Sequence, residues 1–364
     1  MKKLKILYTI PNFDTAGSGK VVYDLVKGLD KEKFEVEIAC SSDKGDFFKE
    51  IVSLNMPIHI VQTTTSYRPY MGLYNRIKPI AKFFKKNKYD IIHSWHWSSD
   101  WTEVLAARWA GAKWIYTKKA MSWGNKHWKI RSFLANFIIT INDEMHTYFS
   151  KKKHQKLIPL GIDTEYYSPL HFKAKENRKT FNIITIANLV PVKGVEVLIK
   201  AIAKIDDDTI VFTVLGDYHN PYGKYLLELC NNLGIQTQVK FLGKKTDIRP
   251  FIVQSDLYII PTLDSGRKEG MPMALVEAMS MGIPVLGSDI SGIRYVLKDF
   301  PNLLVRAADS TKLSDKILKF RHQSKVDRQE LGITLRDYCI VNFNMKKFID
   351  AHELLYLKLS DKKE

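Results

Sequence analysis

One stretch of the sequence decides the fold: Glu269-Gly-Met-Pro-Met-Ala-Leu-Val-Glu277-Ala-Met-Ser-Met-Gly-Ile-Pro-Val-Leu-Gly-Ser-Asp-Ile-Ser-Gly292. A short apolar strand at residues 257–261 precedes it, the spacing of apolar residues predicts a helix over 273–280, and another strand follows at 285–287. Open α/β sheets bind ligands beyond the carboxyl ends of their strands, which is where Glu269 falls. Glu277 follows about two helical turns later if the segment is helical throughout. Taken alone, both glutamates also fit the charged side of an ordinary amphipathic helix.

Alternating strands and helices extend outward from this stretch in both directions. The first half predicts strands at 6–10, 34–40, 58–61, 91–92, 114–117 and 137–142, with helices at 73–86 and 102–110. The pattern breaks near residue 165, passes through a polar stretch at 168–180, and restarts with strands at 181–187, 210–216 and 239–242. The sequence therefore predicts two α/β domains with doubly wound parallel sheets, at 1–165 and 166–364, and a ligand cleft between them. The second domain ends in a helical segment at 331–359.

Length and composition exclude several classes of protein. The chain has 364 residues, enough for two domains with their own cores, and 45% are hydrophobic, which excludes disorder. Cys40, Cys230 and Cys339 are odd in number and far apart, so we expect neither a disulfide framework nor a cysteine metal site. The N-terminal apolar run is too short for a signal peptide, and no segment approaches the roughly 20 apolar residues of a membrane span. We expect a cytoplasmic protein whose contact with membranes is peripheral.

Several motifs in the right order make the chain resemble the family 4 glycosyltransferases, retaining enzymes whose fold, GT-B, has two facing Rossmann-like domains. The two glutamates with seven residues between them, and the Gly-x-Pro after Glu269, match the family pattern. Residues 158–163, 187–194, 241–243 and the glycine-bearing segment at Gly17 match as well. The resemblance implies a retaining enzyme that moves a sugar from a UDP- or GDP-sugar to a glycan or lipid-linked saccharide, in bacterial cell-surface polysaccharide synthesis.

The resemblance also assigns residues to the donor site. The family holds the donor diphosphate with an arginine and a lysine; Lys193 stands at the lysine position, but Asn188 occupies the place of the arginine. Candidate substitutes for the missing charge are Arg249, Arg267 and Lys268. Glu269 matches the sugar contact, and Glu277 the ribose ligand. The backbone that meets the sugar and the β-phosphate, and the loops that line the base, match Gly270, Met271, Pro272 and Met273, and Gly216, Asp217, Leu242, Gly243 and Lys244.

The implied chemistry needs charge stabilisation more than a protein nucleophile. The leaving nucleoside diphosphate gains negative charge, which Lys193 and amide groups at helix N-termini stabilise without a metal. The front-face mechanism proposed for the family makes Glu269 a positioning and electrostatic residue. We expect no cofactor and no metal. Asp206-Asp-Asp208 contains the Asp-x-Asp metal signature, but it precedes a strand and fits a solvated loop.

Two N-terminal motifs complete the candidate site. Gly17, Ser18 and Gly19 open a helix after the first strand and resemble the family's loop that faces the reacting phosphate and the acceptor; a tight strand–helix turn is the alternative. Valine after Lys20 excludes a P-loop. Residues 90–97 resemble the family's His-x-His motif imperfectly, since His93 fits the first histidine and His96 is displaced by one from the second. We take His96 as the catalytic candidate, with His93 as the alternative.

The formal net charge of +17 is unevenly distributed. Residues 1–165, the acceptor-binding half in the family, hold 27 Lys and Arg against 16 Asp and Glu, whereas residues 166–364 hold 29 against 23. Residues 73–88 form a basic amphipathic pattern, and 118–131 mix basic and aromatic side chains. Both compositions are typical of contact with an anionic inner membrane surface or a lipid-linked acceptor. A soluble basic helix is the alternative.

Two other function classes stay open. One is another GT-B enzyme, such as an epimerase or a phosphorylase. The second is a non-catalytic basic protein that binds membrane or nucleic acid, which is disfavoured because no helix-turn-helix, RRM or zinc pattern occurs. We expect no nucleic-acid partner.

Overall fold

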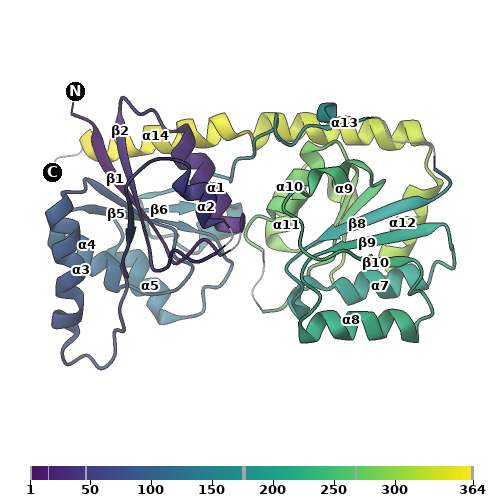
Figure 1. The fold of residues 1–364 in the computed structure, drawn as a ribbon, viewed down its shortest axis with the longest axis horizontal. Helices are drawn as coiled ribbons and strands as arrows, with labels where there is room; N and C mark the ends of the chain where they lie inside the picture. Colours follow the sequence, from purple (N-terminus) through teal and green to yellow (C-terminus); the bar gives the residue numbers. More distant parts are fainter. Residues whose placement is uncertain (1, 15, 46, 174–177, 267–268, 362–364) are drawn as a thin grey trace. The chain divides into compact units, whose positions relative to one another are not determined.

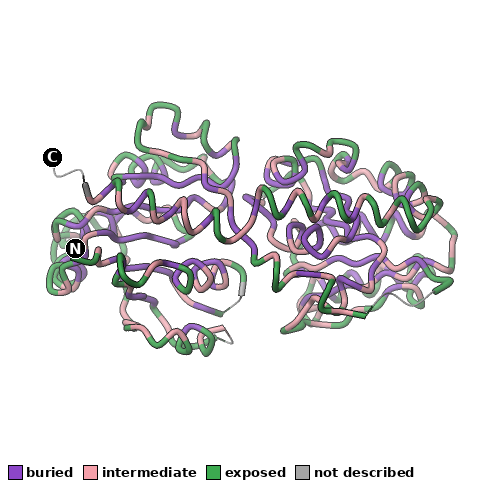
Figure 2. Tube along the Cα trace, turned by 90° about the horizontal axis from the view of Figure 1, so that it is seen from above, coloured by how far each residue is buried: buried purple, intermediate pink, exposed green. Residues whose placement is uncertain are grey.

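The computed structural model describes residues 2–14, 16–45, 47–173, 178–266 and 269–361, and the chain divides into two compact units. Unit 1 comprises Met1–Gly161 and Met345–Glu364, and unit 2 comprises Ile162–Asn344 (Figure 1). Each unit has its own parallel sheet covered by helices. Buried residues follow the strands, and exposed residues lie along the outer sides of the helices (Figure 2).

The seven strands of unit 1 are all parallel and lie in the order β3-β2-β1-β4-β5-β6-β7. Because helices cover both faces, the central strands are almost continuously apolar, as in the LKILYTI sequence of the first strand. Their bounds are β1 Leu4–Ile10, β2 Phe34–Cys40, β3 Ile58–Ile60, β4 Ile91–Ser94, β5 Lys113–Lys118, β6 Phe137–Thr140 and β7 Gln155–Leu157. The order reverses between β1 and β4, and the carboxyl ends of these two strands define the position where such sheets bind ligands.

The helices of unit 1 are α1 Ala16–Gly28, α2 Phe48–Val52, α3 Leu73–Asn87, α4 Thr102–Ala110, α5 Lys126–Leu134, α6 Asp143–Thr147 and α14 Met345–Asp361. The prediction for α3 is accurate because its buried residues, Ile77, Ile80, Ala81 and Phe84, recur at helical spacing.

The domain prediction is wrong for the last helix, which we placed in the second domain. α14 packs on α1 in unit 1, and the hydroxyl of its buried Tyr356 lies 2.6 Å from the Tyr8 hydroxyl of β1. The apolar pattern at residues 331–359 predicts helix correctly. A local pattern does not specify, however, whether the apolar side of a helix packs into the core of unit 1 or into that of unit 2. The helical segment is divided by Phe343 and Asn344 into one helix for each unit.

The six strands of unit 2 are also parallel, in the order β10-β9-β8-β11-β12-β13. They are β8 Phe181–Ile186, β9 Ile210–Leu215, β10 Val239–Phe241, β11 Leu257–Ile260, β12 Val285–Ser288 and β13 Leu304–Val305. The order reverses between β8 and β11, whose carboxyl ends therefore mark the expected ligand position. The helices are α7 Val195–Ala203, α8 Pro221–Asn232, α9 Arg249–Val253, α10 Met273–Ser280, α11 Ser291–Val296, α12 Ser310–His322 and α13 Lys325–Asn342, with single 3-10 turns at Pro169–His171, Pro191–Lys193 and Pro301–Leu303.

None of the helices in the described part of the chain combines the length and the apolarity that crossing a bilayer requires.

Candidate active site

Lys193 and Glu269 meet at the reversal point of the unit 2 sheet. Lys193 ends the 3-10 turn that follows β8, Glu269 lies in the segment between β11 and α10, and the lysine Nζ forms an ion pair with a carboxylate oxygen of Glu269. Both side chains are partly exposed, at 24% and 18%. The pair therefore combines a cation suited to phosphate with a carboxylate suited to sugar hydroxyls, and both remain open to a ligand.

The backbone around this pair is closely packed. The Leu263 N–H donates to the Val192 carbonyl (2.8 Å), which joins the loops after β8 and β11. Gly194 has φ +63°, and a Cβ there would lie 2.2 Å from the Pro261 carbonyl oxygen. Gly292 at the start of α11 is as constrained, because its Cβ would lie 2.3 Å from the Glu269 carbonyl oxygen. Close approach of three backbone segments thus determines where Glu269 stands.

Glu277 lies in α10 and is partly exposed; because α10 begins only at Met273, the two helical turns expected between Glu269 and Glu277 do not form, and Glu277 lies about one turn into the helix. Tyr258 of β11 is fully buried. Burial raises the pKa of its phenol well above the ordinary value, and the charges of Glu277 and Glu269 raise that pKa further. Both carboxylates therefore lie within electrostatic reach of one buried hydroxyl, as expected for residues that act at one site.

The segment before α10 is buried and leads directly into the helix. Gly270, Met271 and Pro272 are buried, and α10 begins at Met273 with no side-chain cap at Pro272. The first turn of a helix has amide groups without intrahelical partners, and these favour an anion. The short segment from Glu269 to Met273 thus runs from the ion pair to a helix N-terminus.

The loops expected to line the base are adjacent to each other. The Gly216 N–H after β9 donates to the Gly243 carbonyl after β10 (3.1 Å), and a Cβ at Gly216 would lie 2.1 Å from the carbonyl oxygen of Ala187, after β8. Asp217 accepts a hydrogen bond from the His219 amide (3.1 Å). Leu242 and Lys244 are exposed. The loops after β10, β9 and β8 therefore form one continuous edge that leads to Lys193.

The structure describes only one of the residues that could replace the missing arginine charge at Asn188. Asn188 is exposed. Arg249 is engaged elsewhere: its guanidinium pairs with Asp247 (2.7 Å), donates to the Tyr166 carbonyl and lies 3.6 Å from the centre of the Tyr166 ring. Arg249 therefore stabilises the Tyr166 segment, and the structure does not favour it as a phosphate ligand. Arg267 and Lys268 lie outside the described residues.

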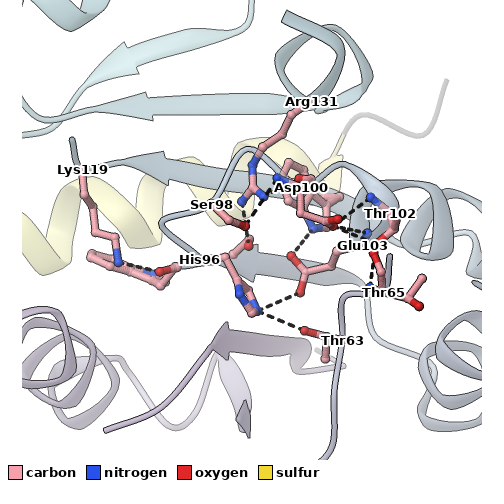
Figure 3. Close-up of polar contacts among 12 residues, drawn as sticks. Thr63, Thr65, His96, Ser98, Asp100, Thr102, Glu103, Lys119 and Arg131 are labelled. Atoms are coloured by element: carbon pink, nitrogen blue, oxygen red, sulfur yellow. Dashed lines mark hydrogen bonds and ion pairs between the residues drawn. The ribbon is translucent and has the colours of Figure 1, made fainter. Parts of the chain in front are cut away.

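In unit 1, His96 follows β4 and is held by residues from two other segments (Figure 3). Its Nε2 lies 3.1 Å from the Thr63 hydroxyl and 3.6 Å from Oε1 of Glu103 in α4. Burial, opposed by the charge of Glu103, lowers the pKa of His96 to about 4, so the ring is neutral near pH 7. The Glu103 carboxylate lies beyond hydrogen-bond distance, but its negative charge near Nε2 favours the tautomer with the proton on that nitrogen, which can then donate to the Thr63 hydroxyl and leaves Nδ1 as an acceptor.

Glu103 and Arg131 carry opposite charges near His96, and both side chains are fully buried. The charge of each favours the charged form of the other, although the described contacts include no direct ion pair between them. Burial raises the pKa of Glu103, but its interactions with His96, with the Arg131 charge and with the Ser94 and Thr63 hydroxyls lower that pKa to a greater extent, so the group is anionic. Glu103 accepts a hydrogen bond from the Trp114 indole (3.2 Å), and Arg131 donates to the Ser94 hydroxyl (3.1 Å) and lies 4.8 Å from the Trp114 ring centre. These contacts fix the orientation of the carboxylate that faces His96.

His93 belongs to the core of unit 1. It is fully buried, its Nδ1 lies 2.7 Å from the Tyr356 hydroxyl of α14, and its Nε2 lies 2.8 Å from the Thr117 hydroxyl. Burial lowers its pKa well below the ordinary value. Both ring nitrogens are used by internal contacts, so the geometry favours His96 over His93 as the histidine available to a substrate.

The glycine segment lies in the first turn of α1, after β1. Gly17, Ser18 and Gly19 all belong to this helix, and the Ser18 hydroxyl accepts a hydrogen bond from Lys119, which follows β5 (3.1 Å). Lys119 also donates to the Trp95 carbonyl and lies 5.3 Å from the Trp95 ring centre. A lysine thus joins the α1 N-terminus to the end of β4, at the reversal point of this sheet.

Among the described residues there is no group of three or more His, Cys, Asp or Glu side chains placed to hold a metal ion. Asp207 of the Asp-x-Asp sequence instead accepts hydrogen bonds from Thr209 and pairs with Arg321 (3.3 Å), so it stabilises its own loop. The three cysteines are free and buried.

Sequence reasoning missed two residues of the unit 1 site, Thr63 and Glu103. Lys119 and Arg131 lie in the basic and aromatic stretch 118–131, which was singled out for contact with a membrane or an acceptor, but their individual roles were not predicted. Glu103 did offer a signal, because it is an acidic residue in a stretch whose other charges are almost all basic.

Two Rossmann-like units, each with its candidate residues at the reversal point of a parallel sheet, define the GT-B class of proteins. Residues 15–166 match the family model "Glycosyltransferase Family 4", and residues 168–332 match "Glycosyl transferases group 1". The chain belongs to the family 4 glycosyltransferases and is a glycosyltransferase. This membership decides against the epimerase and the non-catalytic alternatives.

Relatives match between about half of the chain and nearly all of it. The UDP-Gal:alpha-D-GlcNAc-diphosphoundecaprenol alpha-1,3-galactosyltransferase of Escherichia coli is 23% identical and aligns over 91% of each chain. The capsular polysaccharide biosynthesis glycosyltransferase CapH of Staphylococcus aureus is 22% identical over 94% of this chain and 99% of CapH. The N-acetyl-alpha-D-glucosaminyl L-malate synthase of Bacillus anthracis is 28% identical, but the match spans 48% of this chain and 44% of the synthase.

Solved structures show the same fold. A glycosyltransferase from Rickettsia africae superposes with a TM-score of 0.87 at 19% identity and full coverage of both chains. Anabaena HepE in complex with UDP superposes with a TM-score of 0.81 at 17% identity, over 98% of this chain and all of HepE.

Proposed function

We propose that this enzyme transfers a sugar, with retention of configuration, from a UDP- or GDP-sugar to a lipid-linked saccharide in the synthesis of a bacterial cell-surface polysaccharide. The ion pair of Lys193 and Glu269 at the reversal point of the unit 2 sheet carries this proposal. In an open α/β sheet this is the ligand position, and the pair offers one group for a phosphate and one for a sugar. The UDP bound to HepE, whose fold this chain shares, also supports a nucleotide donor.

Donor binding then exchanges the partners of Lys193. The ammonium moves from the Glu269 carboxylate to the diphosphate, and the amides at the start of α10 meet the β-phosphate. The freed carboxylate positions the sugar and stabilises positive charge at its anomeric carbon as the diphosphate leaves. Glu277 binds the ribose, while the loops at Gly216 and Gly243 line the base. Lys193 supplies the main positive charge, because Asn188 is neutral.

On the unit 1 side we assign His96 to the substrate. With the proton held on Nε2 by Glu103 and Thr63, its Nδ1 accepts a hydrogen bond from a sugar hydroxyl, which positions the sugar without a charged imidazole. Gly17, Ser18 and Gly19, together with Lys119, face the reacting phosphate or the acceptor. The front-face mechanism needs neither a protein nucleophile nor a metal.

The name of the Escherichia coli relative supports the acceptor class, because it specifies a diphosphoundecaprenol-linked sugar, and the name of CapH, a glycosyltransferase of capsular polysaccharide biosynthesis, supports the polysaccharide product. A lipid-linked acceptor stays at the membrane. We therefore extend the proposal to peripheral association of the enzyme with the inner face of the membrane.

A nucleotide screen and a hydrolysis assay test the proposal. One of UDP, GDP and ADP should raise the melting temperature, since saturation at about 100 times the dissociation constant adds about 2.7 kcal/mol. The matching nucleotide-sugar should be slowly hydrolysed in EDTA, and NMR should show the sugar released initially with the donor's anomeric configuration. Glu269→Gln should lower kcat by about 100-fold or more.

Lys193→Ala should weaken nucleotide binding. Lys244→Ala changes an exposed lysine farther along the same edge and serves as the comparison, because it should weaken nucleotide binding less than Lys193→Ala does. The site assignment fails if Glu269→Gln and Lys193→Ala both keep full activity. An inverted product, or activity that depends on added metal, would contradict the mechanism.

A further inference from the structure

Most of the net positive charge of unit 1 lies in its middle. Residues 51–142 contain 14 Lys and Arg residues but three acidic residues, Asp90, Asp100 and Glu103. Glu103 is fully buried, Asp100 is partly buried, and Asp90 accepts a hydrogen bond from the Lys5 amide (2.8 Å). The helices of this region, α3, α4 and α5, therefore expose cations with almost no anions to balance them.

α3 is the most polarised of these helices and contains no acidic residue. Its inner side is buried in the core, and it lies beside α4 at the edge of unit 1 (Figure 1). On its outer side the exposed basic residues recur along the helix: Lys78, Lys82, Lys85 and Lys86. This arrangement presents a line of ammonium groups to one side of the unit.

A cluster of exposed apolar and aromatic side chains adjoins this line. Met71 is 89% exposed, Tyr70 61%, Tyr74 60% and Trp109 of α4 45%. The rings of Tyr74 and Trp109 lie 5.2 Å apart, and the Lys78 ammonium lies 5.9 Å from the Tyr74 ring centre. Large apolar groups gathered at one exposed place mark an interaction surface.

The cluster is held in shape by Arg76, which points back beneath the loop. Its guanidinium donates to the carbonyls of Ser66 (3.0 Å), Met71 (3.3 Å) and Pro69. Three hydrogen bonds from one side chain fix the loop that presents Tyr70 and Met71. Little conformational entropy is therefore lost when this surface binds a partner.

We propose that this surface, which we call the docking face, binds an anionic lipid bilayer; it consists of Tyr70, Met71, Tyr74, Lys78, Lys82, Lys85, Lys86 and Trp109. The proposal rests on the proposed function only in that a lipid-linked acceptor is reached at a membrane. Lysines attract anionic headgroups while their stems lie along the apolar boundary, and Tyr and Trp favour the headgroup level. Met71, the most exposed of the group, inserts into the acyl boundary, a role that a nucleic-acid surface would not require.

Vesicle sedimentation with the full chain tests this assignment. Vesicles of phosphatidylglycerol and phosphatidylethanolamine should bind the protein at least 10-fold more tightly than phosphatidylcholine vesicles, and binding should weaken as salt rises. Removing one lysine near an anionic surface costs about fivefold in affinity, so Lys82→Glu/Lys85→Glu should lose at least about 25-fold. Met71→Ser/Trp109→Ser should lose the binding that persists at high salt.

Matched variants in unit 2 provide the controls. Lys200→Glu/Lys224→Glu makes the same change of charge at exposed positions of α7 and α8, and Leu170→Ser removes an apolar side chain that is 86% exposed. Both should bind anionic vesicles within about twofold of the unmodified protein. The docking-face variants should still bind the nucleotide and transfer sugar to a short water-soluble acceptor, which shows that they fold.

The assignment is overturned if both docking-face variants bind anionic vesicles as tightly as the unmodified protein, or if the unit 2 control variants lose as much affinity as the docking-face variants. It is also overturned if the docking face binds RNA or a second copy of the chain and does not bind vesicles. Vesicle binding through the docking face without any sugar transfer would instead refute the proposed function and leave this inference standing.

Discussion

Thr63, His96 and Glu103 come from three segments of unit 1, and their side chains meet beside the carboxyl end of β4. An acidic residue with no exposed surface is costly unless an opposite charge compensates it, and Arg131 supplies that charge. The sequence identified His96 from an imperfect motif, because a motif is local. Its partners are separated from it along the chain and carry no pattern, so no reading of spacing could have found them.

The Glu103–Arg131 pair predicts a measurable coupling in stability. Glu103→Gln removes the carboxylate that most favours the buried charge of Arg131 and should destabilise the protein by about 3 kcal/mol; Arg131→Met should cost a similar amount. Since each single change leaves one charge uncompensated, the double variant should be at least about 1 kcal/mol more stable than the sum of the two losses predicts.

Urea unfolding of the four proteins checks this cycle. Lys126→Gln, at an exposed position at the start of the same helix as Arg131, should change stability by less than about 0.5 kcal/mol. Strict additivity of the two losses would show that the two charges do not interact.

Among the elements, α10 and α11 illustrate what a sequence pattern can and cannot predict. The apolar spacing predicts α10 at Met273–Ser280, as observed, because periodicity is a local property. The contact between Gly292 of α11 and the Glu269 backbone is not visible in any periodicity. It depends on two segments 23 residues apart approaching to a distance that leaves no room for a methyl group.

Gly292→Ala should therefore disturb the site from outside it. The added Cβ would lie 2.3 Å from the Glu269 carbonyl oxygen and 2.7 Å from that of Gly270, so the backbone must shift. We expect a loss of about 1–3 kcal/mol in stability, and a fall in kcat because Glu269 moves with its peptide. Thermal unfolding and sugar-transfer kinetics measure the two effects.

Gly124→Ala is the comparison, because a Cβ at Gly124 meets nothing within 4 Å. That variant should match the unmodified protein in both assays. An unaltered melting temperature in Gly292→Ala would mean that the close approach is not maintained.

For the molecule as a whole, the two units differ in their buried histidines. His93, His96 and His352 are buried in unit 1 and burial lowers the pKa of each, to about 4 for His96 and His352. The histidines of unit 2, at positions 171, 219 and 322, are exposed. Unit 1 thus contains buried histidines that take up protons more readily when it unfolds. The lowered pKa values of Asp207 and Asp247 in unit 2 belong to carboxyl groups, which titrate at lower pH than histidine.

This difference predicts that unit 1 is the acid-sensitive unit. A buried histidine with a lowered pKa stabilises the folded unit fully only when the pH is above its pKa in the unfolded chain, about 6.5. This stability is lost as the pH falls from about 6.5 towards the pKa of the histidine in the folded unit. Each such group gives a slope of up to about 1.4 kcal/mol per pH unit. Hydrogen exchange should therefore show unit 1 losing protection before unit 2 between pH 6.5 and 4.5.

His352→Met should reduce this acid sensitivity, because it removes one of the groups that become protonated. Replacing the exposed His219 by Gln should leave the acid sensitivity of both units unchanged. Equal loss of protection in both units would contradict the prediction.

The sequence by itself determined the two parallel-sheet units, the position of the Glu269 segment after a strand, and the family to which the chain belongs. These features depend on periodicity and short motifs, which neighbouring residues in the chain are sufficient to encode. Only the tertiary structure decided that α14 completes unit 1, that His93 serves the core while His96 faces Glu103, and that Arg249 is occupied by Asp247 and Tyr166. Each of these depends on which distant segments share a core or a charge, and burial settles that only once the chain has folded.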